Sequence, residues 1–154
     1  MTGGTFRHNR IALNVAAELR QRFNDTPCQV FINDVKLHVA AADAVHYPDV
    51  FVHCGAAVAG NEKLADDAVA VVEVLSESTE STDRREKLAA YKRLPGLRAF
   101  LLIAQAEQSI EVHARNAQGQ WTAVRYGTGE SIDEAALGGE SLSLAVVYAG
   151  TDIA

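Results

Sequence analysis

No hydrophobic run in the sequence reaches the roughly 18 residues that a membrane-spanning helix needs, and residues 1–5 lack the basic and apolar regions of a signal peptide. Positive charge is also scarce, because 14 lysines and arginines face 20 acidic residues, for a formal net charge of -6. This balance argues against a protein that grips nucleic acid through its overall charge, although it leaves room for a local basic face. We expect a soluble, cytoplasmic protein with no membrane partner.

Cysteine is scarce as well. The two cysteines, Cys28 and Cys54, lie in apolar surroundings without a CxxC spacing. This pattern predicts buried thiols in a reducing cytoplasm rather than a disulfide framework. Repeats and low-complexity segments are missing, and 154 residues of which 48% are hydrophobic suffice for one core. We therefore expect a single domain over residues 1–154.

Hydrophobic periodicity gives a coarse map of the first half of the chain. Apolar residues recur every fourth position over residues 9–23, which predicts an amphipathic helix. Alternation over residues 29–39 predicts a half-buried strand, interrupted by the polar pair Asn33 and Asp34 and followed by a connection over residues 40–45. Strands are expected at residues 50–54 and in the apolar run 68–75, with a loop over residues 55–67 between them.

The second half begins with a helix signal. Asp83 and Glu86 form a plausible capping box, which predicts a helix from Asp83 to about Leu94, before Pro95. Residues 97–104, 110–114 and 121–126 predict three short strands in an antiparallel meander. Weaker signals favour one last strand around residues 142–148.

Glu73 is the residue that most needs an explanation, because it interrupts a continuous apolar run. Burying a lone carboxylate costs several kcal/mol or shifts its pKa, so Glu73 requires a cation, a donor or a strand end open to water. If strands 50–54 and 69–75 are neighbours, Asp49 and Glu73 project toward one sheet edge. A hard divalent cation, Mg²⁺ or Mn²⁺, would relieve their repulsion, and the backbone carbonyl of Val74 would add a ligand.

The helix that follows can supply a cation of its own. Lys87 lies one turn into this helix, where its amine can offset phosphate charge or assist a water, and Tyr91 shares the same helix face. A metal site with a nearby lysine and tyrosine is the set of groups that phosphodiester hydrolysis uses. His8 is a further catalytic candidate, although it reads equally well as a capping or core histidine.

Simpler interpretations stay open for most of these residues. A Pro-Asp pair such as Pro48 and Asp49 is common in turns, and Lys87 can form a plain surface ion pair with Asp83. His46, Asp49 and His53 suggest zinc, but their spacing matches no tight ligand pattern.

The sequence resembles the Uma family of restriction endonucleases, within the PD-(D/E)XK nuclease-like superfamily. The resemblance spans most of the chain and rests on four segments: residues 3–11 (GGTFRHNRI), 47–50 (YPDV), 72–79 (VEVLSEST) and 83–91 (DRREKLAAY). It implies an α/β fold with a mixed sheet flanked by helices, and a site in which Asp49 and Glu73 bind metal. DNA is the substrate that the resemblance implies.

The sequence departs from the superfamily pattern in two places. The lysine expected two residues after the acidic strand residue is replaced by Leu75, so that Lys87 resembles a migrated lysine supplied from the helix. The resemblance also implies a helix and a strand upstream of the Gly-Gly motif, near which this sequence begins, so either the start is annotated late or this piece is missing. An open sheet edge would result, and we expect a homo-oligomer that covers it.

Two functions from different classes remain. The first is a metal-dependent endonuclease that contacts phosphates through a local basic face, formed by Arg84, Arg85, Lys87, Lys92, Arg93 and Arg98 together with Arg7, Arg10, Arg20 and Arg22. The second is a non-catalytic interaction domain that kept a nuclease-like fold and uses the acidic stretch 62–83 to bind protein. Binding of Mg²⁺ or Mn²⁺ distinguishes them.

Overall fold

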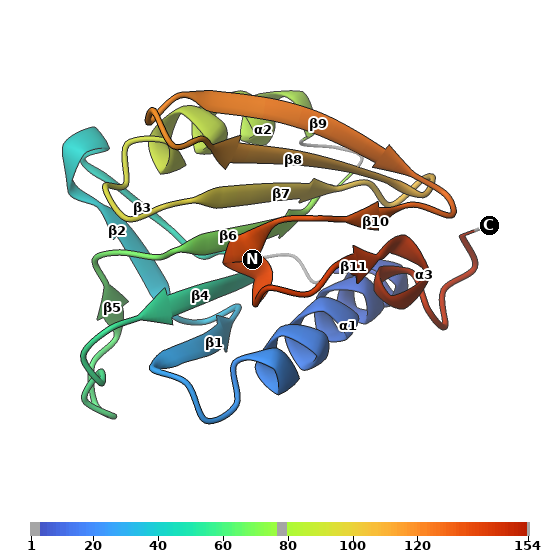
Figure 1. The fold of residues 1–154 in the computed structure, drawn as a ribbon. Coiled ribbons are helices and arrows are strands. Elements are labelled where there is room, and N and C mark those ends of the chain that lie inside the picture. Colours follow the sequence, from blue (N-terminus) through green and yellow to red (C-terminus); the bar gives the residue numbers. More distant parts are fainter. Residues whose placement is uncertain (1–3, 77–79, 154) are drawn as a thin grey trace.

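The computed structural model describes residues 4–76 and 80–153, with side chains of residues 80–84 excepted. A six-stranded mixed sheet forms its centre, in the order β1-β4-β6-β7-β8-β9 (Figure 1). All neighbouring strands run antiparallel except β6 and β7, which are parallel and are joined through α2 (Glu80–Tyr91). The strands are β1 (Cys28–Ile32), β4 (Val50–Cys54), β6 (Ala70–Val74), β7 (Ala99–Ile103), β8 (Ser109–Arg115) and β9 (Trp121–Gly127).

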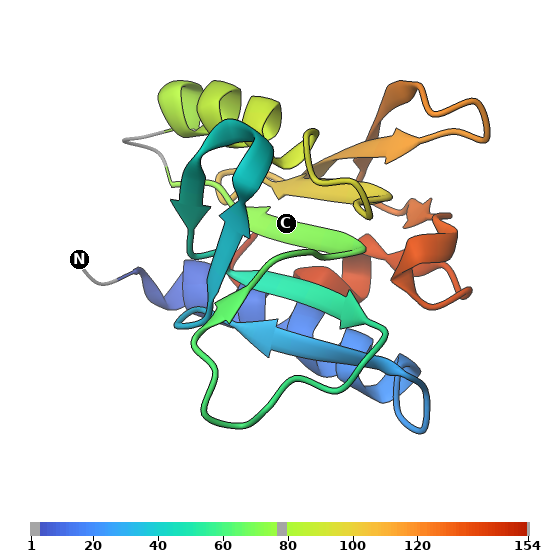
Figure 2. The ribbon, with the colours of Figure 1, turned by 90° about the vertical axis from the view of Figure 1, so that its left-hand side faces the viewer.

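Helices cover both faces of this sheet, as Figure 2 shows with α2 above the strands and α1 (Phe6–Arg22) below them. Helix α1 begins at the N-cap Thr5, whose hydroxyl accepts a hydrogen bond from the His8 amide. Its stripe of Ile11, Val15 and Leu19 is fully buried against alternate sheet residues. Tyr91 and Leu94 pack on the opposite face, in a second apolar cluster. The expectation of a mixed sheet flanked by helices is confirmed.

Smaller elements complete the fold. A three-stranded sheet in the order β3-β2-β5 extends the α2 side of the molecule, where Leu37, Val39 and Ala65 join the second cluster. The C-terminal part packs beside α1. The bounds are β2 (Lys36–Val39), β3 (Ala44–His46), β5 (Leu64–Ala65), β10 (Ser131–Ile132), β11 (Leu142–Ser143), the 3-10 helices η1 (Ala40–Ala42) and η2 (Ala135–Leu137), and α3 (Leu144–Val147).

The meander and the strands at residues 50–54 and 68–75 are confirmed, but several other expectations are wrong. The loop expected over residues 55–67 contains the short strand β5. Residues 29–39 form two strands in different sheets, because the chain turns at Asn33, whose φ of 49° is a left-handed value that asparagine tolerates. The connection expected over residues 40–45 contains η1 and the start of β3. Residues 142–148 form β11 and α3, whose first turn is capped by the Ser143 hydroxyl.

The predicted capping box is also wrong, since α2 begins at Glu80 and Asp83 lies inside it. The side chain of Asp83, and with it the expected ion pair to Lys87, lies outside what the structure describes, as does the side chain of Arg84. None of the described helices is long and apolar enough to cross a membrane.

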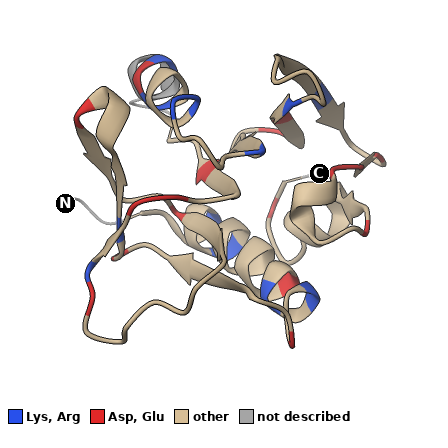
Figure 3. Cartoon of the chain, turned by 60° about the vertical axis from the view of Figure 1, so that its left-hand side comes forward, with Lys and Arg blue, Asp and Glu red and all other residues tan. Residues whose placement is uncertain are grey.

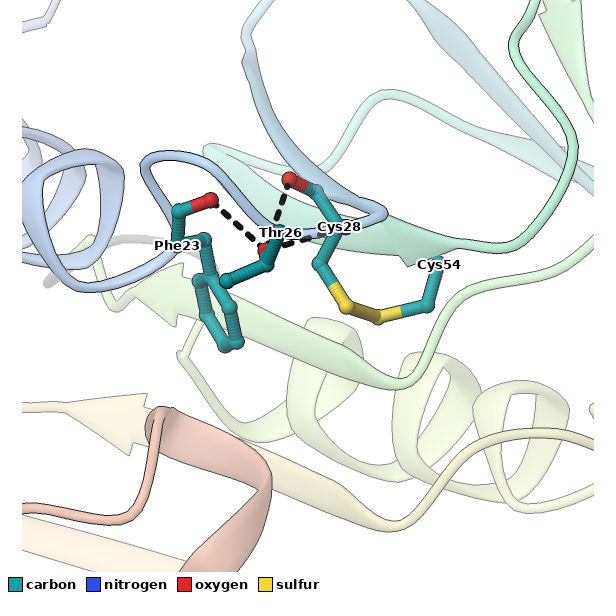
Figure 4. Close-up of a disulfide and its surroundings, with 4 residues drawn as sticks. All are labelled: Phe23, Thr26, Cys28 and Cys54. Atoms are coloured by element: carbon teal, nitrogen blue, oxygen red, sulfur yellow. Dashed lines mark hydrogen bonds between the residues drawn. A yellow bond between two sulfur atoms is a disulfide. The ribbon is translucent and has the colours of Figure 1, made fainter.

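The cysteines are disulfide-bonded, so the prediction of buried free thiols is wrong (Figure 4). Cys28 and Cys54 are directly opposite each other where β1 pairs with β4, with their Cα atoms 4.0 Å apart. Both residues are half-buried rather than buried. The bond links residues 26 positions apart and fastens the edge strand β1 to β4. Because it lowers the conformational entropy of the unfolded chain, a crosslink of this kind typically adds ~2–4 kcal/mol to the free energy of unfolding.

Candidate active site

Strand pairing brings the two predicted acids together. Val50 pairs with Val72, so the next step of the antiparallel register places Asp49, one residue before β4, opposite Glu73 of β6. Both line a pocket of about 130 Å³, together with His8, Tyr47, Val74 and Lys87. Three parts of the chain therefore meet here: the first turn of α1, the strand ends at which Asp49 and Glu73 lie, and α2.

Glu73 is the most deeply buried of these charged residues, with 5% of its surface exposed. The Tyr91 hydroxyl donates to its Oε1 at 3.0 Å, and the Lys87 Nζ lies 3.4 Å from its Oε2. The pKa of Glu73 is raised to about 8, chiefly by burial and also by the charge of Asp49, while the charge of Lys87 and the hydrogen bonds from Tyr91 and Lys87 oppose the shift. At neutral pH the metal-free carboxyl group is therefore mostly protonated.

Asp49 is held by hydrogen bonds from two sides. Its Oδ2 accepts from the backbone N–H of Val74 at 2.8 Å, which ties it to the end of β6. The same oxygen lies 3.4 Å from Nε2 of His8 in the first turn of α1. Asp49 thus connects the helix to the acidic strand.

His8 takes its place in the site through this contact. The hydrogen bond with Asp49 raises the pKa of His8, and the nearby charges of Asp49 and Glu73 and a hydrogen bond to the Val74 backbone act in the same direction, while burial lowers it. The simpler interpretation of His8 as a core histidine does not fit, because its ring lines the pocket and pairs with an acid.

Lys87 and Tyr91, four residues apart on α2, both contact Glu73 from the same helix face. Their positions differ in one respect, because Lys87 lines the pocket whereas Tyr91 is fully buried. The Tyr91 ring packs at steep angles against Phe100 and His46, with ring centroids 5.0 and 5.2 Å away. Leu75, at the position where the superfamily has its lysine, lines the pocket as an apolar residue. The amine reaches the acid from the helix instead.

The zinc alternative finds no support. His46 packs edge-on against Tyr91, and His53 pairs with Gln29 on the edge strand. Within residues 4–76 and 80–153, no group of three His, Cys, Asp or Glu side chains is placed to hold a metal. A metal at Asp49 and Glu73 would therefore complete its coordination with backbone, water or substrate oxygens, as Mg²⁺ commonly does.

The expected basic face is only partly available. Arg22 has a side-chain exposure of 7% and donates to Glu18 and to the carbonyls of Leu137 and Ser141, so it holds the C-terminal part on α1. Arg7 forms a two-bond pair with Asp152. Exposed arginines remain along α1 and along α2 and the turn after it: Arg10, Arg20, Arg85, Arg93 and Arg98. Figure 3 marks the lysine and arginine positions of the chain in blue.

Sequence reasoning missed one residue of the site's surroundings, Gln105. It lies in the turn after β7, is 8% exposed and bonds to both Thr5 and Leu75. A glutamine in a polar turn carries no sequence signal of its own. Only the close approach of the β7–β8 turn, the start of α1 and the end of β6 shows its importance.

A mixed sheet with two acids at one edge, a lysine from the next helix and a helix on each face defines a restriction-endonuclease-like protein. The family model described as "Uma2: Putative restriction endonuclease" matches residues 1–146. The chain belongs to this family, and with it to the restriction-endonuclease-like nucleases.

The chain is also similar to two uncharacterized proteins and, in its fold, to a solved structure. The chain is 27% identical over 150 residues to uncharacterized protein slr1290 of Synechocystis sp., covering 97% of this chain and 78% of that protein. It is 29% identical over 128 residues to uncharacterized protein sll1609 of the same organism, covering 79% and 70%. A crystal structure from Anabaena variabilis, described as "a putative nuclease belonging to DUF820", superposes with a TM-score of 0.77 at 15% identity, covering 96% of this chain and 82% of that one. This last likeness concerns the fold.

Proposed function

We propose that this protein is a Mg²⁺- or Mn²⁺-dependent endonuclease that hydrolyses phosphodiester bonds of DNA at the site between Asp49 and Glu73. One observation carries the proposal: a buried glutamate, held by Tyr91 and Lys87, lies opposite a second acid at the mouth of a pocket. A structural role alone does not explain why this position holds a carboxyl group, because burial there raises the pKa of Glu73 and so disfavours its charged form.

The donors present suit a hard divalent cation. Asp49 and Glu73 offer carboxylate oxygens, and the Val74 carbonyl, which hydrogen-bonds with His8, lies beside them. When bound, such an ion neutralises charge on the scissile phosphate and lowers the pKa of a water. It would also offset the burial that now keeps Glu73 protonated.

The remaining residues then have separate tasks. Lys87, whose amine lies 3.4 Å from Glu73, offsets negative charge on the phosphate. Tyr91 fixes Oε1 of Glu73 through its 3.0 Å hydrogen bond, while Oε2 lies on the side of the pocket-lining Lys87 amine. His8 orients Asp49 through its Nε2.

The partner follows from the same site. A nucleic acid would lie across the pocket mouth, where Lys87 supplies positive charge, and would continue along α2 past the exposed Arg85 and Arg93 despite the acidic whole. Arg98, whose backbone N–H bonds to the Val69 carbonyl before β6, lies at the other end of the strands. The partly exposed Tyr47, which lines the pocket beside Asp49, offers an aromatic surface to a base.

The proposal is tested by incubating the full-length protein with plasmid, single-stranded DNA and RNA, with and without MnCl₂. We expect cleavage of DNA that requires Mn²⁺ or Mg²⁺ and stops with a chelator. Absence of cleavage on all three substrates, together with absence of divalent-metal binding, would instead favour a non-catalytic interaction domain.

We also propose a homo-oligomer. Among the residues that the structure describes, β1 and β9 lie at the two ends of the six-stranded sheet and have one unpaired side each, and Val124 of β9 is half exposed. Light scattering at micromolar concentration should give at least the mass of a dimer. A compact monomer, indifferent to concentration, would contradict this part of the proposal.

A further inference from the structure

Gln105 is one of three polar or charged residues that are buried within the described part of the chain, with Glu73 and His113. Its side chain lies between two segments of the candidate active site. Nε2 donates to the backbone carbonyl of Leu75 at 2.7 Å, and Oε1 accepts from the Thr5 hydroxyl at 3.0 Å. Both ends of the amide are therefore satisfied, as a buried amide requires.

The orientation of this amide follows from its neighbours. The Leu75 carbonyl can only accept, so it must face the NH₂ end of Gln105, and the oxygen end then faces Thr5. Thr5 meets this requirement because its oxygen already accepts the His8 amide as the α1 cap, which leaves the hydroxyl proton for Gln105. The bonds run from His8 through Thr5 and Gln105 to Leu75.

A second route joins the same two segments through the acid. Nε2 of His8 contacts Asp49, and Asp49 accepts from the N–H of Val74, the residue before Leu75. The start of α1 is thus tied to the end of β6 twice, once through Asp49 and once through Gln105. The residues at the ends of these ties, His8, Val74 and Leu75, line the pocket.

Polar ties matter here because the first turn of α1 has little apolar packing. Phe6 is 99% exposed, and full burial of the helix begins only at Ile11. Besides the two ties, a surface pair of Arg7 with the largely exposed Asp152 holds this turn, and exposed pairs contribute little.

We propose that Gln105 is a positioning residue of the active site, which sets the distance between the His8–Asp49 pair and the end of the acidic strand. The role of Gln105 in catalysis rests on the proposed function. Its effect on the first turn of α1 does not depend on that function. Gln105 touches neither substrate nor metal ligand and acts through Thr5 and Leu75.

Gln105→Met, which keeps the length and removes both hydrogen bonds, is compared with Gln108→Met, a matched change in the same turn. We expect Gln105→Met to speed hydrogen exchange of the His8 amide about tenfold, the factor that one net hydrogen bond corresponds to. Exchange near Leu19, at the far end of α1, should stay unchanged. Affinity for Mn²⁺, measured by calorimetry, should fall by about the same factor. The value of kcat should fall, while KM should change less.

Thr5 supplies the second test, since it is exposed and its variants should fold. The loss of Mn²⁺ affinity caused by Gln105→Met should largely disappear in a Thr5→Val background, whereas Thr5→Ser should preserve it. Equal exchange and equal Mn²⁺ affinity for the Gln105→Met and Gln108→Met variants would overturn the proposal, as would faster exchange over the whole helix. Exchange needs neither metal nor substrate, so a wild-type protein without nuclease activity would refute the proposed function while this readout still decides the role of Gln105.

Discussion

Replacing Asp49 with Asn or Glu73 with Gln is expected to abolish metal-dependent cleavage, by at least about two to three orders of magnitude. Each change removes one charged oxygen donor from the proposed metal site while preserving shape, and losing a single preorganised electrostatic group commonly costs this much. Asp34→Asn, in an exposed turn between β1 and β2, serves as the matched control and should cleave like the wild type.

Metal-free stability separates a functional acid from a structural one. Asn at position 49 can still accept from Val74, and Gln at position 73 can still accept from Tyr91. Neither variant should therefore melt lower than the wild type, and either can melt higher because the two acids no longer oppose each other. A loss of several degrees in metal-free buffer would mean that the acid serves the fold, through an ion pair whose breakage costs ~3 kcal/mol or more.

The second large effect is a pH dependence caused by Glu73. The pKa of this carboxyl group is about 8 in the folded protein against an ordinary value of 4.5, so the folded state binds the extra proton between these values. Stability contributed by the protonated group is present at low pH and is lost as pH rises through this window, by an amount of the order of 5 kcal/mol. The Glu73→Gln variant should lack this loss.

The measurement is a set of denaturant curves between pH 5 and 9, without metal, for wild type, Glu73→Gln and Glu86→Gln. The raised pKa of His8 also lowers stability as pH rises, but His8 is common to all three proteins. The difference between wild type and Glu73→Gln should grow toward pH 9, while Glu86→Gln, altered at an exposed position on α2, should follow the wild type. Parallel curves for all three would show that Glu73 ionises normally.

Metal affinity should also depend on the ionisation of Glu73, but it should rise with pH, whereas the metal-free stability falls. A cation needs the ionised carboxylate, so below pH 8 each binding event releases a proton and affinity rises about tenfold per pH unit. Calorimetry in buffers of different ionisation enthalpy counts this proton directly. Affinity that ignores pH between 6 and 8 would place the metal away from Glu73.

The acid pair could be predicted because its signals are local. A glutamate within an apolar run and an acid at the start of the neighbouring strand need only the pairing of β4 with β6 to meet. Lys87 and Tyr91 follow from helical spacing. The strand pairing that unites them was a hypothesis at the level of sequence, and the structure supplies it.

Features that depend on distant register could not be predicted in the same way. Cys28 and Cys54 face each other only because β1 pairs with β4 in one particular register, and a shift of one residue would separate them. Residues 29–39 carry one alternating pattern although they belong to two sheets, because the left-handed turn at Asn33 does not change the hydrophobic alternation on either side of it. Gln105 depends on three segments meeting, which no periodicity reports.

Diffraction from crystals soaked in MnCl₂ tests the central claim most directly, because anomalous scattering locates manganese without any assumption about the reaction. A single strong peak is predicted between Asp49 and Glu73, about 2.1 to 2.2 Å from a carboxylate oxygen of each, with the Lys87 amine facing the same pocket. A soaked crystal with no peak there, or with the two carboxylates more than about 8 Å apart and unable to share an ion of such short ligand distances, would contradict the claim.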